Sequence, residues 1–232
     1  VRDNSLVVDD KITVAEFCNL WGDTIIPNNV DRSTEQIYRY ALGHWVLPHV
    51  GHIRLVEFTS QDYAQMQQTL LNSGLSAATV RHARRPLHAC LNQAVRMGNL
   101  RTNPVSAIPQ PKLNGPGAEK ARRLSKNEAT TMLKLVQSEE PMLTGLVSLA
   151  LLRGLRRGEV LGLKWEDREG DIIHIRRSLC EESVKAKDGS TVTRLRAKRP
   201  KTKTSIRDIT LNESLKVTLK RISAKQASER LK

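Results

Sequence analysis

The chain of 232 residues has few aromatic residues and no long apolar run. Aromatic side chains make up only 3% of it, so it offers few surfaces on which unpaired bases could stack. No stretch approaches the roughly 20 apolar residues that a membrane-spanning helix needs. We therefore expect neither a membrane protein nor a protein that binds single-stranded RNA.

Cysteine is also scarce, and the three cysteines (Cys18, Cys90 and Cys180) lie far apart without a C-x-x-C pair. This pattern predicts reduced thiols in a cytosol and argues against a disulfide scaffold or a zinc site. Three histidines cluster in HWVLPHVGH, but no cysteine or carboxylate lies at ligand spacing beside them. We expect no metal and no other cofactor.

Positive charge is abundant and unevenly distributed. The net charge is +14, but residues 1–110 carry only +1 of it, residues 111–232 carry +13, and residues 176–232 alone carry +11. A protein that neutralises phosphates releases their counterions, so a basic surface favours polyanion binding. Because almost all of the excess lies at one end, a nucleic-acid surface is favoured over an ordinary solvated face.

Four helices are predicted in the first domain, residues 11–106, after a linker over residues 1–10. The chain begins at Val1 instead of methionine, so we take residue 1 as a boundary set by processing or by the choice of fragment. The predicted helix caps are Thr13 (with Glu16 in a capping box), Ser33, Ser60 and Ser76. The predicted inward residues are Val14, Phe17, Cys18, Trp21, Ile37, Tyr40, Ala41, Val80, Leu87, Leu91, Ala94 and Val95.

A linker rich in proline and glycine, residues 107–121, separates this domain from a second one over residues 122–232. There we expect a helix after the capping box Ser125/Glu128 and an apolar helix over 142–152. The spacing of apolar residues then changes to the alternation typical of strands at 171–175, 192–198 and 205–211, and a last helix follows Asn212. The predicted fold class is α+β, an all-α four-helix domain followed by a mixed domain with a small antiparallel three-stranded sheet.

The sharpest motif is Gly-Leu-Arg156-Arg157-Gly-Glu159, followed by an apolar helix and Trp-Glu-Asp167. An arginine at a helix start presents a planar fork that can hold two phosphate oxygens. A glutamate three residues later can orient neighbouring cations. The alternative is an ordinary surface pair at i, i+3, which contributes little to stability.

A second basic element follows, Pro-Lys201-Thr-Lys203-Thr-Ser-Ile-Arg207-Asp-Ile-Thr-Leu. A third pattern lies in the first domain. It consists of LSAATV, the apolar residues Leu87, Leu91, Ala94 and Val95, and Asn103-Pro104. Together these elements resemble, over about residues 11–222, the tyrosine recombinase and phage integrase family. The resemblance implies a SAM-like core-binding domain and the N-terminal part of a catalytic domain.

The resemblance implies DNA integration or site-specific recombination by strand cleavage through a 3′-phosphotyrosyl intermediate. Arg156 would clamp phosphate oxygens, Glu159 would support the site, and Lys201 would act as general acid, with Lys203 as its competitor. The residues expected at the DNA are Arg81, Arg84, Arg85, Arg157 and Lys203. The implied partners are duplex DNA and, in the full-length protein, a homotetramer on paired DNA sites. The implied location is the cytoplasm. The gene would belong to a bacterial cell, a phage or a mobile element.

One departure from the family pattern limits what the chain can do. No histidine follows His174, so no H-x-x-R box is present, and the only tyrosines are Tyr38, Tyr40 and Tyr63 in the first domain. We therefore expect a domain truncated at its C-terminus, which binds DNA but lacks the nucleophile and is inactive alone. The alternatives are a non-catalytic DNA-binding regulator of the same fold and a type IB topoisomerase-like strand transferase.

Overall fold

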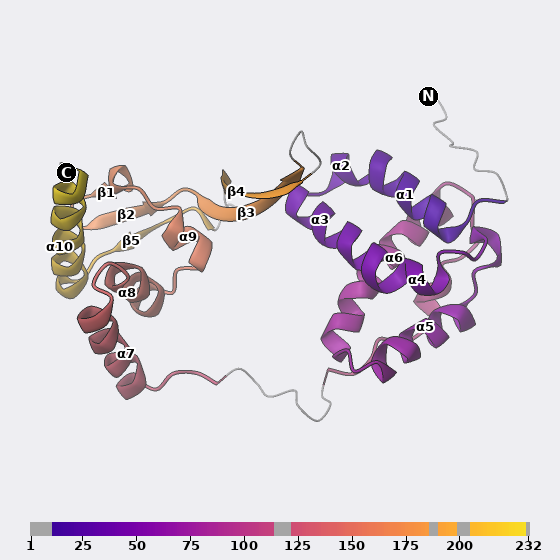
Figure 1. Cartoon of the computed structure of the whole chain (residues 1–232), viewed down its shortest axis with the longest axis horizontal. Helices are drawn as coiled ribbons and strands as arrows, with labels where there is room; N and C mark the ends of the chain where they lie inside the picture. Colours follow the sequence, from indigo (N-terminus) through magenta and orange to yellow (C-terminus); the bar gives the residue numbers. More distant parts are fainter. Residues whose placement is uncertain (1–10, 114–121, 186–189, 199–204, 231–232) are drawn as a thin grey trace. The chain divides into compact units, whose positions relative to one another are not determined.

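The computed structural model describes residues 11–113, 122–185, 190–198 and 205–230. The chain divides into two compact units, Val1–Lys120 and Ala121–Lys232 (Figure 1). Across the described residues, no helix combines the length and the hydrophobicity that a membrane crossing requires.

The first unit is built from helices. They are α1 (Val14–Thr24), α2 (Ile26–Asn29), α3 (Arg32–Ala41), the π-helix η1 (Leu42–Val46), α4 (Leu47–Val50), η2 (Leu55–Glu57), α5 (Ser60–Asn72), α6 (Ala77–Arg96) and η3 (Pro104–Ala107). The four longest, α1, α3, α5 and α6, lie where the sequence predicts helices (Figure 1). Extended pairing among the described residues of this unit is limited to one isolated bridge, Thr13 with Arg54.

Local sequence explains the ends of these helices. The predicted capping box of Thr13 and Glu16 is present in α1, and Ser76 caps α6. Helix α5 begins one residue earlier than predicted, because Thr59 forms a capping box with Asp62. The hydrophobic core of this unit includes most of the predicted inward residues: Val14, Phe17, Cys18, Trp21, Val80, Leu87, Leu91 and Ala94.

Two cysteines meet inside this core. The Sγ atoms of Cys18 on α1 and Cys90 on α6 are 3.5 Å apart, and both residues are buried. Burial raises the pKa of the Cys90 thiol well above its ordinary value, because desolvation disfavours the thiolate. Both cysteines are free, so no disulfide joins them.

Two of the three residues predicted to point inward from α3 are exposed, and only Ala41 is buried. Ile37 and Tyr40 are 58% and 57% exposed, whereas Tyr38 packs on Trp21 with ring centroids 6.1 Å apart. The helix begins at Arg32, so Ser33 does not cap it. Tyr40 stacks on His44 of the π-helix that follows, at the surface.

The second unit combines helices with two small sheets. The helices are α7 (Lys126–Glu139), α8 (Thr144–Arg153), α9 (Arg157–Leu161), η4 (Trp165–Asp167) and α10 (Glu213–Arg230), and the strands are β1 (Arg168–Glu169), β2 (Ile172–Ile175), β3 (Ser178–Lys185), β4 (Thr191–Lys198) and β5 (Arg207–Thr210). The capping box of Ser125 and Glu128 and the cap of α10 by Asn212 are present as predicted.

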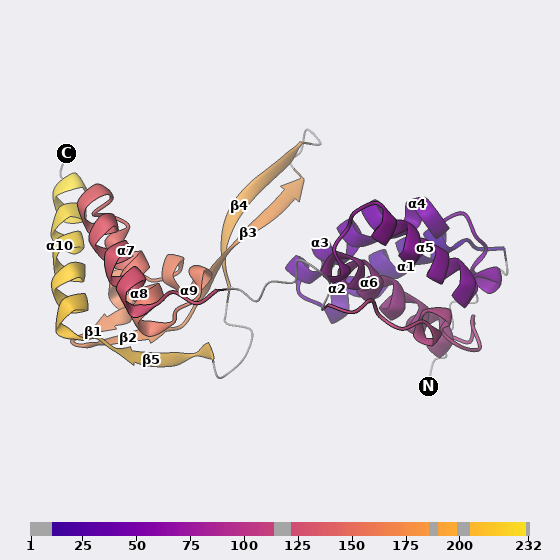
Figure 2. The ribbon, with the colours of Figure 1, turned by 90° about the horizontal axis from the view of Figure 1, so that it is seen from below.

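The three-stranded antiparallel sheet has the order β1-β2-β5, so its membership differs from the prediction. Residues 192–198, expected in that sheet, lie in β4, which pairs with β3 in a separate hairpin. The hairpin projects from the rest of the unit (Figure 2). Strand β3 was missed because its polar residues fall on both faces, and β1 because it has only two residues.

A second core joins α8, α9, β2 and α10. Its buried members are Leu149, Leu155, Val160, Ile173, Ile175, Leu211, Leu215 and Leu219. Two of them, Leu155 and Val160, flank the start of α9. This core therefore fixes the first turn of α9 beside the sheet.

Candidate active site

Arg156 lies at a sharp reversal of the chain. Helix α8 ends at Arg153, and Gly154 takes the left-handed conformation with φ +64°, which favours glycine. Leu155 is buried and anchors the turn, and Arg156 is then the N-cap of α9 with an extended backbone. The string Gly-Leu-Arg thus places the Arg156 side chain at the surface, where it is 74% exposed.

The carboxylate of Glu159 connects this turn to the sheet. Its side chain is only 3% exposed. Its Oε2 accepts from the backbone N of Arg156 at 3.0 Å, and its Oε1 accepts from Arg156 Nη1 at 2.9 Å. Arg207 on β5 donates to both oxygens, with Nη2 to Oε2 at 2.9 Å and Nη1 to Oε1 at 3.1 Å. One buried carboxylate therefore holds two arginines.

These contacts keep Glu159 ionised. The hydrogen bonds from Arg207, followed by those from Arg156, lower the pKa of Glu159 from 4.5 to about 2, although desolvation acts in the opposite direction. In return, Glu159 raises the pKa of the Arg207 guanidinium. The cluster of two arginines and one carboxylate carries a net positive charge near neutral pH.

Two glycines let α9 pack directly on the start of β3. A Cβ atom at position 158 would lie 2.7 Å from the carbonyl oxygen of Leu179, and one at 162 would lie 3.1 Å from the Leu179 nitrogen. A second buried carboxylate, Asp167, accepts from Arg177 Nη1 at 2.8 Å and from the Lys164 backbone at 2.8 Å. These contacts support the turn that follows α9.

The predicted site residues fall into three groups. The structure brings Arg156 and Glu159 into direct contact, and Arg157 is an exposed residue at the start of α9. Lys201 and Lys203 lie outside the described residues.

The other predicted cations lie on α6 in the first unit. Arg81 Nε donates to the Pro111 carbonyl and Arg84 Nη2 to the Val105 carbonyl, both at 2.9 Å, so these two side chains hold the segment that follows α6. Arg85 is exposed.

Sequence reasoning assigned no role to Arg207, although the residue stands in the second basic element. A signal for it was present. Arg207 and Ile209 alternate with exposed residues along β5, and buried Leu211 follows the strand in the same phase, so the arginine occupies an inward position among apolar residues. A charged group at such a position requires a partner of opposite charge.

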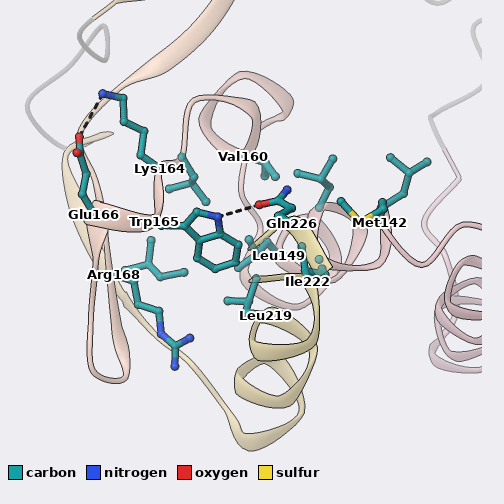
Figure 3. A pocket seen from close by; sticks show the side chains of 15 residues that line it. Met142, Leu149, Val160, Lys164, Trp165, Glu166, Arg168, Leu219, Ile222 and Gln226 are labelled. Atoms are coloured by element: carbon teal, nitrogen blue, oxygen red, sulfur yellow. Dashed lines mark hydrogen bonds and ion pairs between the residues drawn. The ribbon is translucent and has the colours of Figure 1, made fainter. Parts of the chain in front are cut away.

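A hollow of about 690 Å³ opens elsewhere in the second unit. Its walls are largely apolar, with Leu149, Val160, Leu219 and Ile222 among the lining residues (Figure 3). The Trp165 indole donates to Gln226 Oε1 at 2.8 Å (Figure 3). Glu159 and Arg207 do not line this hollow, so it is distinct from the ionic cluster.

Curated relatives cover most of the chain. It is 30% identical over 169 residues to the tyrosine recombinase XerC-like protein of Caldanaerobacter subterraneus, which matches 70% of this chain and 42% of the relative. It is 24% identical over 177 residues to an integrase of Saccharopolyspora erythraea, with coverage of 75% and 39%. The chain thus spans about two fifths of the length of these relatives. No family model matches it.

Solved structures share the fold. The Tn1549 transposon integrase in complex with transposon right end DNA superposes with a TM-score of 0.77 at 19% identity, covering 92% of this chain and 65% of that one. A lambda integrase tetramer bound to a Holliday junction gives a TM-score of 0.62 at 19% identity, covering 81% and 52%.

The lowered pKa of Glu159 predicts a pH-dependent contribution to stability. A carboxyl group of depressed pKa stabilises the fold above its ordinary pKa, and this contribution is lost as pH falls from about 4.5 towards about 2. We expect the loss in free energy of unfolding caused by Glu159→Gln to be greatest near pH 6. It should shrink by up to roughly 3 kcal/mol at low pH.

Urea denaturation at a series of pH values measures this difference. Glu139→Gln, which alters an exposed carboxyl on α7, is the matched control and should show little effect at any pH. A destabilisation by Glu159→Gln that stays constant from pH 6 to pH 3 would contradict the depressed pKa.

Proposed function

We propose that this chain, a member of the tyrosine recombinase family, binds duplex DNA and supplies part of the site that cleaves and rejoins DNA strands in site-specific recombination. The observation that carries the proposal is Arg156. Its guanidinium extends into solvent, yet one nitrogen and its own backbone are fixed by a buried carboxylate. Such a pre-positioned cation suits a phosphate oxygen.

The proposed reaction uses a tyrosine hydroxyl as the nucleophile. Its oxygen attacks a backbone phosphorus, the bond from phosphorus to the 5′-oxygen breaks, and a 3′-phosphotyrosyl link and a free 5′-hydroxyl result. A 5′-hydroxyl of the partner strand reverses the step, so the bond energy is conserved without ATP. Arg156 would stabilise charge on the phosphate, and Lys201 would protonate the leaving oxygen as general acid, with Lys203 as the alternative.

None of the chain's three tyrosines is suited to this role. Tyr63 is buried, its hydroxyl donates to Gln67 Oε1 at 3.0 Å, and desolvation raises its pKa. Tyr38 packs on Trp21, and Tyr40 stacks on His44. All three belong to the first unit, whereas Arg156 belongs to the second. We therefore propose that this chain binds DNA and does not cleave it unaided.

The proposed DNA surface rests on the net positive charge of the chain, and the proposed oligomeric state rests on a relative. The excess of +13 on residues 111–232 suits the phosphate backbone, and Arg85 on α6 offers an exposed cation in the first unit. We propose a tetramer on paired DNA sites in the full-length protein, as in the lambda integrase complex. A cytoplasmic location follows because bacterial and mobile-element DNA lies there. A DNA-binding regulator is the second candidate, because the second unit has no tyrosine.

Binding to duplex DNA should depend strongly on salt. Each phosphate that the protein neutralises lowers the slope of log K against log salt by about 0.9, so several contacts cost orders of magnitude in affinity. Fluorescence anisotropy with a labelled duplex of about 30 base pairs, between 50 and 200 mM NaCl, should show a loss of about 100-fold or more. Arg156→Ala should retain most of the affinity, since many cations remain. An affinity that does not change with salt would refute the proposed DNA surface.

No covalent DNA adduct should form with this chain, even on a nicked duplex that traps cleavage. The physical reason is that all three tyrosines belong to the first unit, whereas Arg156 belongs to the second, and that Tyr63 is in addition buried. Denaturing electrophoresis of the mixture measures the adduct. If one appears, separate Tyr→Phe changes at positions 38, 40 and 63 would identify the nucleophile, and the proposal that this chain does not cleave unaided would be wrong.

A further inference from the structure

We propose that Arg207 is a positioning residue, which keeps Arg156 available to a DNA phosphate by neutralising Glu159. This inference rests on the proposed function, because it concerns how the same site holds a phosphate. It assigns no contact between Arg207 and the DNA.

The two arginines share the carboxylate unequally. Arg207 binds both oxygens of Glu159 in a fork and is 31% exposed. Arg156 uses a single side-chain nitrogen, Nη1, on the same carboxylate and is 74% exposed. Among the described residues, the Arg156 guanidinium pairs with Glu159 alone, and its high exposure leaves it accessible to a phosphate.

Charge explains why the unequal sharing matters. Glu159 is buried and ionised, so its negative charge must be balanced locally. Arg207 provides that balance, so the charge of Arg156 remains available to a phosphate. Without Arg207, the carboxylate would have only Arg156 as a cationic partner. A bidentate pair is the strongest geometry available to it, so Arg156 would fold onto Glu159 and the site would lose its cation.

The backbone supports this division of roles. Arg207 begins β5 and pairs in register with Ile175 of β2, so its Cα position is fixed by the sheet. Its Nη1 also donates to the Ser205 carbonyl at 3.3 Å. Arg207 lies four residues after Lys203 in the chain. The pair with Glu159 therefore ties the end of the basic element to the helix that Arg156 caps.

The experiment is a double-mutant cycle on the salt dependence of duplex binding. Arg156→Ala and Arg207→Met should each make the slope of log K against log salt shallower by about 0.9, the value of one phosphate contact. The double variant should lose no more than either single variant, because both changes remove the same contact. Arg177→Met is the matched control. It removes an arginine from another buried carboxylate, Asp167, and should leave the slope unchanged.

Two further variants separate positioning from a purely structural role. Glu159→Gln combined with Arg207→Met removes both charges, so it should restore the slope that Arg207→Met loses. Arg207→Lys keeps the charge and should retain the slope even if it lowers the melting temperature. Thermal unfolding of every variant shows whether it is folded at the binding temperature. If Arg207→Met does not fold, a lowered slope in folded Arg207→Lys would overturn the inference, because the positive charge beside Glu159 is retained in that variant.

The outcomes are distinct. An unchanged slope in folded Arg207→Met, together with a lowered slope in Arg156→Ala, would overturn the inference and leave the proposed function standing. Additive losses in the double variant would also overturn it, since Arg207 would then bind phosphate itself. A slope unaffected by Arg156→Ala would refute the proposed phosphate contact of Arg156, and the inference with it.

Discussion

The buried carboxylate of Glu159, shared by Arg156 and Arg207, is the interaction on which the second unit depends. It joins the N-terminus of α9 to β5, two segments that are 48 residues apart in the chain. A buried carboxylate with no cationic partner would cost several kcal/mol, and Glu159 has two such partners. The cluster is therefore a structural constraint and, at its exposed edge, a source of positive charge.

Several neighbouring residues position the three side chains of this cluster. Gly154 reverses the chain so that Arg156 caps α9, and Gly158 lets α9 approach the backbone of β3. Leu155 and Val160 place the helix against the core, and the alternation along β5 directs Arg207 inward. Backbone conformation, close packing and charge thus explain Gly154, Leu155, Arg156, Gly158 and Glu159 of the motif.

Sequence reasoning succeeded where a signal is local. Capping boxes at Thr13 and Ser125 and the apolar stripe of α6 follow from spacing alone. It failed where the signal depends on distant partners: the π-helical turn after α3, the polar hairpin and the ion pair of Arg207. At the candidate site, the contact of Arg156 with Glu159 was foreseeable from their i, i+3 spacing. The inward position of Arg207 indicates that it needs a partner of opposite charge, but not that the partner is Glu159, because β3 and β4 separate the two residues in the chain.

A crystal structure of this chain bound to duplex DNA would test the central claim most directly. The account predicts that the Arg156 guanidinium contacts non-bridging oxygens of a backbone phosphate, while Arg207 keeps Nη1 and Nη2 on Glu159. A complex in which Arg156 is paired only with Glu159, or in which Arg207 leaves Glu159 to bind the phosphate, would contradict it.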